Sequence, residues 1–438
     1  MFGGYVSKIL ESTSPPYGLL LLALGTVFIA QIVRTLAWRL WLHPLASIPG
    51  PRLAAVSGLW QMRQDLFLEN SARAIDQLHR EYNTDIVRIS PNHVHINDPD
   101  FFFKIFSIGS GFDKDPSFYG RLGVPRSILS ADSRSARAMR SKANAIVAPR
   151  DWGVMAEKAY LATRLASDEL AILSKKGEEI DFFQMLRSIS TDILCQLSYG
   201  FSPGFVDKPE EAKKLFDVLD MCLESLWFRK NSEMVRTFGT QTIDHYLPVV
   251  HMPFLSEYLF SLPKWLLKIL LPAFTYFRNL GGGWIDQTLE NSKNAHPNDK
   301  KTTVMDALNP SKDHILTEAD REWLIDQGNT FLFAGVDTTS TMLMFTFHKV
   351  LSSPGIHGRL KEELRNANLS IEEKYDWRRV RQLPYLTAVI KEGLRLSLVI
   401  PGRLPRLVPA DGIEFNGIFL PGGGNKDFGI QHDLLDAS

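Results

Sequence analysis

The strongest pattern in the chain is an apolar run near its amino terminus. Residues 17–33 (YGLLLLALGTVFIAQIV) carry no charged side chain, and two arginines and two tryptophans follow within eight positions. About 20 apolar residues cross a bilayer as a helix, and basic and aromatic residues favour its cytoplasmic interface. We therefore predict a short lumenal segment over 1–16 and one transmembrane anchor over 17–38. A cleaved signal peptide and a buried core helix are the alternatives.

A proline-rich connector follows the anchor. Prolines at 44, 49 and 51 disfavour helix and stiffen the chain. We interpret residues 39–52 as a hinge that holds a larger body close to the membrane.

The body begins with a pattern typical of strands and continues with patterns typical of helices. Alternating apolar residues over 85–90 and 93–96, around Pro91 and Asn92, predict a β-hairpin. Its second strand carries His93 and His95 on one face; a packed pair is favoured over a metal pair because no third ligand is near in sequence. Apolar residues three and four apart then predict helices over 153–173, 182–199 and 210–228.

Two later segments are less regular. Residues 255–277 are apolar and aromatic but contain two prolines and several charges, so we predict either an interfacial membrane segment or a core element. Residues 296–314 are polar and proline-containing, which predicts a surface loop.

A long helix is predicted from a capping box at Thr317 and Asp320 to Leu351, before a Ser-Ser-Pro-Gly stop. Its middle, residues 331–336, is apolar on all sides and should be buried.

An acid and three hydroxyls follow directly, as Asp337 and residues 338–340. Polar groups in a buried helix are costly unless they are satisfied or functional, and a threonine can bond the carbonyl one turn back. Gly335 would leave room for a small ligand against the backbone. Two interpretations stay open: a satisfied polar cluster at a helix kink, or a proton-relay groove beside a bound substrate or gas.

A second charged helix opens at Leu383-Pro384 and places Glu392 and Arg395 three residues apart on one face. Such a pair alone is weak evidence, because exposed pairs are common. An Arg-Leu-Pro-Arg segment follows at 403–406, and residues 412–420 predict a hairpin that turns at Asn-Gly.

Composition narrows the possible classes. The 438 residues are 45% hydrophobic and 22% charged, with 49 basic and 49 acidic side chains. These values exclude a disordered chain, and the zero net charge gives no overall electrostatic field that would attract nucleic acid. The two cysteines, Cys195 and Cys222, lie in predicted apolar helices and exclude a disulfide scaffold. The glycine runs 281–283 and 422–424 lack the residues of a phosphate loop.

Taken together, the motifs resemble the cytochrome P-450 family of haem-thiolate monooxygenases, and most closely its microsomal members from fungal secondary metabolism. The resemblance covers nearly the whole chain and rests on segments spread along it: the anchor, Pro49-Gly50-Pro51, residues 86–91, Phe112–Asp115, residues 334–339, the Glu392–Arg395 helix and residues 403–406. It implies a mainly α fold with small β-sheets, a catalytic domain over 53–423, and bound haem.

The resemblance also assigns roles by position. Asp337 and Thr338 match the acid-alcohol pair that delivers protons to iron-bound dioxygen, and Ala334 and Gly335 match the small residues of the oxygen groove. Glu392 and Arg395 match a structural ion pair behind the haem. Arginines match the haem propionate contacts: on the strand, Arg406 and, less closely, Arg403. In the segment 136–140, Arg140 and Arg137 match a basic motif of the family. That motif usually begins with histidine or tryptophan, where this chain has Ala136. A solvated basic helix face is the alternative for Arg140 and Arg137.

One part of the family pattern is absent. The axial cysteine loop would follow the hairpin, but no cysteine occurs after Cys222, and residues 424–438 form a polar tail unlike the family. We thus expect an incomplete C-terminal part of the fold and no metal ligand in the chain.

Two classes of function follow from this pattern. The first is a monooxygenase of the endoplasmic reticulum membrane that oxidises a lipophilic small molecule, such as a terpenoid or polyketide, with O2 and electrons from an NADPH-dependent reductase. The second is an inactive product without haem chemistry. No nucleic acid partner is expected.

Overall fold

The computed structural model describes residues 15–67, 71–107, 109–119, 126–147, 152–235, 266, 272–294, 303–310, 316–367, 377–397, 399–400, 402, 404–422 and 429–431. The chain divides into two compact units. The first comprises Met1–Phe112 and Arg403–Asp433, and the second comprises Asp113–Gly402 and Leu434–Ser438. The fold is mainly helical with small sheets, as the sequence predicts.

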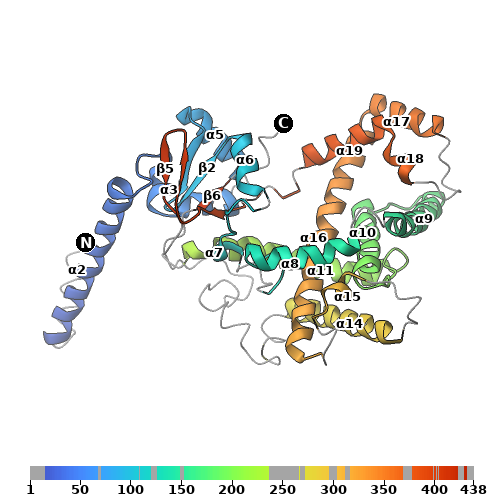
Figure 1. The fold of residues 1–438 in the computed structure, drawn as a ribbon, viewed down its shortest axis with the longest axis horizontal. Helices are drawn as coiled ribbons and strands as arrows, with labels where there is room; N and C mark the ends of the chain where they lie inside the picture. The colour runs from blue at the N-terminus through green and yellow to red at the C-terminus, as the bar shows by residue number, and fades with distance from the viewer. Residues whose placement is uncertain are drawn as a thin grey trace. The chain divides into compact units, whose positions relative to one another are not determined.

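The first unit begins with the apolar helix α2, Pro15–Ala37, which continues into a π-helical turn η1, Trp38–Leu42 (Figure 1). The stretch Tyr17–Leu42 is 26 residues long, and its apolar 18-residue window has a mean hydropathy of 2.0 and no buried residue. By length and composition this helix could cross a membrane.

The predicted hinge packs more closely than a loose linker. Leu45 and Ile48 are buried in the core of the first unit, and the carbonyl oxygen of Pro49 accepts a hydrogen bond of 2.7 Å from the backbone N–H of Arg88. A Cβ on Gly50 would lie 2.2 Å from the Arg88 carbonyl oxygen, so only glycine fits there. The connector is therefore part of the folded body.

A four-stranded sheet with the order β1-β2-β6-β3 forms the centre of the first unit. The predicted hairpin is confirmed as β1, Ile86–Ser90, antiparallel to β2, His93–Ile96. The short strand β3, Arg406–Leu407, pairs antiparallel with β6, Gly429–Gln431, which runs parallel to β2. The polar tail thus contributes a strand that no periodic pattern predicts.

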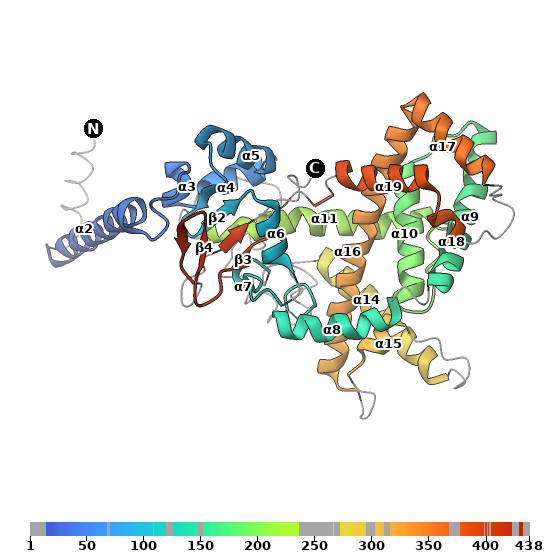
Figure 2. The same cartoon turned by 45° about the horizontal axis from the view of Figure 1, so that its top comes forward.

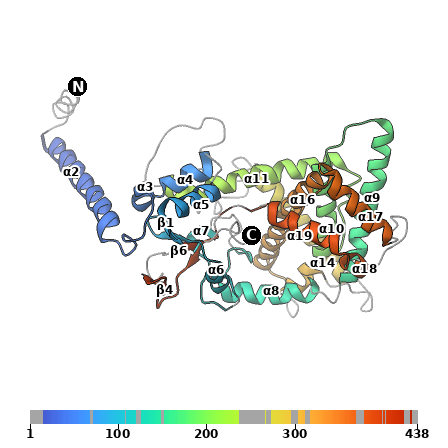
Figure 3. The same ribbon diagram turned by 90° about the horizontal axis from the view of Figure 1, so that it is seen from above.

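Short helices and a second hairpin complete this unit. Helices α3, α4 and α5 contact β1 and lie together beside the sheet (Figures 2 and 3). The predicted Asn-Gly hairpin is confirmed, with positive φ angles of 49° at Asn416 and 76° at Gly417. The bounds are α3 Arg52–Val56, α4 Leu59–Met62, η2 Arg63–Phe67, α5 Ser71–Tyr82, α6 Pro99–Phe106, β4 Ile413–Phe415 and β5 Ile418–Leu420.

The second unit is helical throughout its described part. Helix α16, Glu318–Leu351, contacts α10 along its length, α14 and α15 near its start, and α17 and α19 near its end (Figure 2). The remaining bounds are α7 Pro116–Tyr119, α8 Ser133–Val147, α9 Trp152–Lys176, α10 Phe182–Ser198, α11 Pro209–Val235, α14 Pro272–Asn294, α15 Val304–Leu308, α17 Pro354–Asn366, α18 Trp377–Arg381 and α19 Pro384–Ser397. Helices α9, α10, α11, α16 and α19 confirm predicted helices.

The predicted surface loop over 296–314 is wrong in part. Within it, Thr303 and Asp306 form a capping box that starts α15, and Val304, Met305 and Leu308 are buried. The interpretation of 255–277 as interfacial or core lies mostly outside the described residues; its end begins α14 and buries Phe277.

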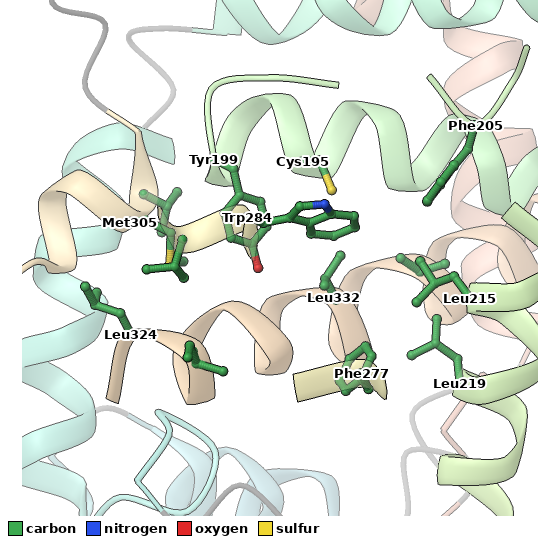
Figure 4. Close-up of a cluster of buried hydrophobic side chains, with 14 of the residues drawn as sticks. Cys195, Tyr199, Phe205, Leu215, Leu219, Phe277, Trp284, Met305, Leu324 and Leu332 are labelled. Carbon is green, nitrogen blue, oxygen red and sulfur yellow. The ribbon is translucent and has the colours of Figure 1, made fainter. Parts of the chain in front are cut away.

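The main core of the second unit lies between α10, α14 and α16. Cys195 of α10 and Tyr199, the C-cap residue of that helix, point towards α16, with Trp284 of α14 beside them (Figure 4). Gly281 serves this packing, because a Cβ there would lie 2.3 Å from the side-chain oxygen of Asn329, whereas a Cβ on Gly283 would meet open space. All three glycines of 281–283 lie within α14 and do not form a phosphate loop.

Candidate active site

Helix α16 positions the polar residues that the sequence singles out. Thr317 accepts a hydrogen bond from the backbone N–H of Asp320, and Asp320 accepts one from the backbone N–H of Thr317, which completes the predicted capping box. The apolar Leu332 and Val336 are fully buried, so the middle of the helix is anchored in the core. This anchoring fixes the residues that follow.

Two of the three hydroxyl groups after Asp337 donate to carbonyl oxygens of the same helix. Thr338 Oγ1 donates to the carbonyl oxygen of Ala334 at 2.5 Å, and Ser340 Oγ donates to that of Val336 at 2.5 Å. Because α16 stays helical to Leu351, these bonds do not break it. Thr338 uses its proton for this bond, and its oxygen keeps lone pairs that can accept another hydrogen bond.

Asp337 forms an ion pair with an arginine of the neighbouring helix. Arg187 Nε of α10 lies 2.7 Å from Asp337 Oδ1, and the two side chains are 6% and 17% exposed. The other oxygen, Asp337 Oδ2, is buried and has no hydrogen-bond partner within the described part of the chain. One carboxylate oxygen is therefore held, and the second stays open to a proton.

Arg187 is itself held from a third helix. Its Nη2 and Nη1 atoms donate to Asp220 Oδ1 and Oδ2 of α11 at 2.7 and 3.1 Å. The guanidinium also lies over the ring of Phe216, 4.6 Å from its centroid. A bidentate fork and an aromatic face together fix the orientation of an arginine.

The surroundings raise the pKa of Asp337 above its usual value. Burial is the largest cause, and the negative charge of Asp220 adds to it, while Arg187 acts in the opposite direction. A carboxyl whose pKa is moved toward neutral pH is better suited to take up and release a proton.

The two small residues before Asp337 differ in their surroundings. Ala334 is exposed, so α16 presents a small methyl group beside Thr338. Gly335 faces α10 instead: a Cβ there would lie 2.9 Å from Leu194 Cδ2. The missing side chain of Gly335 lets α10 and α16 approach closely, and room for a ligand against its backbone stays a prediction.

The second predicted pair forms, but at the surface. Arg395 donates to both Glu392 oxygens at 2.8 and 2.6 Å, and the side chains are 45% and 54% exposed. Arg395 lowers the pKa of Glu392 mainly through its hydrogen bond. Between them, Gly393 packs against α16, where a Cβ would lie 2.1 Å from Thr346 Oγ1.

The predicted propionate arginines belong to both units of the chain. Arg137 and Arg140 both lie on the exposed face of α8, while Ala136 and Ala143 of that helix are buried. Arg406 is half-buried in β3 of the first unit, with its guanidinium over the ring of Phe106. Arg403 lies outside the described residues.

Neither cysteine is placed as a thiolate ligand. Cys195 is fully buried in the core, and burial raises the pKa of its thiol well above the usual range. Cys222 lies on α11 two positions after Asp220, which places it about 200° around the helix from the face that binds Arg187. Among the described residues, no three histidine, cysteine or acidic side chains gather to hold a metal ion.

The histidines of β2 have other partners. His95 Nδ1 lies 2.7 Å from His79 Nε2 of α5, and His93 Nδ1 lies 2.8 Å from Ser90 Oγ. They form a packed polar cluster, the alternative that the sequence favours.

Sequence reasoning missed Arg187 and Asp220. Arg187 is a charged residue inside a helix of mostly apolar and small residues, and its neighbours Leu186 and Ser188 are buried too. A buried arginine needs an acidic partner, so this position signals a hidden ion pair. The partner's identity depends on how α10, α11 and α16 pack, which local pattern does not give.

Comparisons with known proteins agree with these observations. The sequence model of the family described as Cytochrome P450 matches residues 48–425. The chain is 34% identical to the cytochrome P450 monooxygenase aneF of Aspergillus aculeatus, over 91% of this chain and 78% of that protein. It is 31% identical to the cytochrome P450 monooxygenase BOT1 of Botryotinia fuckeliana, over 95% and 78% of the two chains.

The chain therefore belongs to the cytochrome P450 family of haem-thiolate monooxygenases, and haem is the cofactor of that family. Ala334 is exposed and Thr338 is half-buried on one face of α16, and these small side chains fit a haem lying against that face.

Proposed function

We propose that this protein is a membrane-anchored monooxygenase that oxidises a lipophilic small molecule, of the secondary-metabolite class, with O2 and electrons from an NADPH-dependent reductase. The observation that carries the proposal is the Asp337–Thr338 pair of α16, in a chain of this family. Asp337 is mostly buried and held through one oxygen, and Thr338 keeps an accepting lone pair.

In this proposal the haem, when bound, supplies the iron that activates dioxygen. Asp337 exchanges a proton at Oδ2, and Thr338, the next residue of α16, passes or positions it. We assign Ala334 to the oxygen side, and Arg406 and Arg140 to the haem propionates; Arg137 and Arg403 are second choices. Glu392 and Arg395 act as a structural pair. These assignments rest on the motif positions.

The proposal also covers the location of the protein and the class of its substrate. The exposed apolar helix α2 and the arginines after it support a single-pass anchor in the endoplasmic reticulum membrane, with the body on the cytoplasmic face. A terpenoid- or polyketide-like substrate is part of the proposal by analogy with the family, and the fungal relatives support a secondary metabolite in general. Carbonate extraction of microsomes tests the anchor: the full chain should stay in the pellet, and release into the supernatant would contradict it.

A threonine pair of α16 tests the chemistry. Thr338→Ala, in microsomes with an NADPH-dependent reductase, should lower product formed per NADPH consumed by about tenfold or more, since a positioned proton donor contributes about 10²–10⁴-fold. Thr339→Ala is the matched control, because Thr339 is the exposed neighbour on the same helix. Equal coupling in the two variants would overturn the role of Thr338.

The second candidate is a haem-free, inactive protein. The placement of Cys195 and Cys222 favours it, because neither is positioned as an axial ligand. A carbon-monoxide difference spectrum of the purified full chain separates the two candidates. A thiolate-type Soret band supports the monooxygenase, and a colourless protein supports the inactive alternative.

A further inference from the structure

Three charged side chains from three helices form a chain of contacts that ends at Asp337. Asp220 of α11 binds Arg187 of α10 through two hydrogen bonds, and Arg187 contacts Asp337 of α16. The exposed fractions are 53% for Asp220, 6% for Arg187 and 17% for Asp337. The chain of charges thus leads from the surface to the buried acid.

The geometry leaves Arg187 little freedom. Two of its guanidinium nitrogens are held by Asp220 and its flat face lies on Phe216, so Nε is the atom left for Asp337. An arginine fixed in this way sets the position of the carboxylate it touches, because a planar fork cannot follow a moving partner without losing its other bonds.

We propose that Arg187 is the positioning residue of Asp337 and that Asp220 fixes Arg187 in place. Arg187 holds Asp337 Oδ1, which leaves Oδ2 free to exchange the proton that the acid-alcohol pair uses. The inference rests on the proposed function of Asp337, but the contact it describes can be measured without turnover.

The electrostatics of the three residues agree with this geometry. Arg187 favours the ionised form of Asp337, whereas burial and Asp220 favour the protonated form. Removing the cation should therefore favour the protonated acid, and removing the charge of Asp220 should favour the ionised one. The two changes act on one carboxyl in opposite directions.

The test measures the titration of Asp337 directly. Infrared difference spectra of the full-length chain, with Asp337→Asn subtracted, isolate the carboxyl band of Asp337 as pH is varied. Compared with the unsubstituted chain, Arg187→Gln should raise the pKa of Asp337, Arg187→Lys should return it toward the original value, and Asp220→Asn should lower it.

A matched ion pair elsewhere provides the control. Asp286 of α14 binds Arg321 of α16 through two hydrogen bonds of 2.8 and 2.6 Å and is 54% exposed, much like Asp220. Asp286→Asn removes the same kind of contact away from Asp337 and should leave the titration of Asp337 unchanged.

The outcomes separate cleanly. Asp220→Asn acting like Asp286→Asn, or Arg187→Gln and Arg187→Lys giving the same titration, would overturn the positioning role. If Arg187→Gln does not fold, the titrations of Asp220→Asn and Arg187→Lys still test the positioning role, because Asp220 is half-exposed and lysine keeps the positive charge. If the shifts occur but Asp337→Asn leaves product per NADPH unchanged, the contact stands and the proposed proton role of Asp337 fails.

Discussion

Two acid–arginine pairs of the second unit have the same chemistry and different surroundings. Arg187 and Asp337 join α10 to α16, with exposed fractions of 6% and 17%. Glu392 and Arg395 lie three residues apart on α19, and both are about half exposed. The contact distances are 2.7 and 2.6 Å, so distance does not distinguish the pairs.

Burial distinguishes them. Water competes with the exposed pair and screens it, whereas the buried pair must remain complete, because each charge without its partner would lie in a poorly solvated site. The pKa values move accordingly: burial raises that of Asp337, and the hydrogen bond from Arg395 lowers that of Glu392. A short ion pair therefore indicates an energetic role only together with its environment.

The largest expected effect comes from breaking the buried pair. Arg187→Leu removes the cation and leaves Asp337 without its partner, which should lower the free energy of unfolding by about 3 kcal/mol or more. Urea unfolding of the full chain measures it. A loss below about 1 kcal/mol would show that water reaches Asp337 and that the two pairs are alike.

The next largest effect on stability is expected at the glycines beside the two pairs. Gly393→Ala would place a Cβ 2.1 Å from Thr346 Oγ1, on a stiff β-branched side chain, so overpacking should cost about 1–3 kcal/mol. Gly335→Ala meets only the flexible end of Leu194, and the gain in helix propensity of about 1 kcal/mol should offset most of its cost. Unfolding midpoints rank the two, and the reverse order would contradict the observed packing.

The pH dependence of stability should have opposite signs at the two acids. The folded-state pKa of Asp337 is raised, so the native state holds its proton longer than the unfolded chain. Its contribution to stability is then lost as pH rises from the unfolded pKa to the folded one. Measuring the free energy of unfolding of the unsubstituted chain and of Asp337→Asn across pH isolates this contribution. The unsubstituted chain should lose stability relative to the variant as pH rises, and a relative gain would contradict the raised pKa.

At Glu392 the folded-state pKa is lowered, so its stabilisation is present above the unfolded pKa and lost as pH falls through the folded one. Because the pair is exposed and screened by water, Glu392→Gln should give the smallest change in the free energy of unfolding at neutral pH. A loss comparable to that of Arg187→Leu would mean that other residues bury this pair in solution.

The sequence predicts those features that depend on neighbours along the chain. The capping box at Thr317, the hairpin turn at Asn416 and Gly417, and the Glu392–Arg395 pair all involve contacts within a few residues. Asp337 and Thr338 were identified in the same way, as polar residues after a buried apolar run.

The missed features depend on packing between distant segments. Arg187 reaches Asp337 only because α10 crosses α16, and Gly335 faces Leu194 for the same reason. The strand β6 has no periodic pattern of its own and forms by pairing with β2 and β3. Helix α15 did carry a local signal, the capping box at Thr303, but the polar residues around it hid the signal.

A double-mutant cycle tests the central claim that Asp337 is held by Arg187. The free energies of unfolding of Arg187→Gln, Asp337→Asn and the double variant give the coupling between the two side chains, and Arg395→Gln with Glu392→Gln gives the matched exposed cycle. We predict a coupling of about 1–3 kcal/mol for the buried pair and a clearly smaller coupling for the exposed pair, which water screens. Equal couplings in the two cycles would contradict the claim.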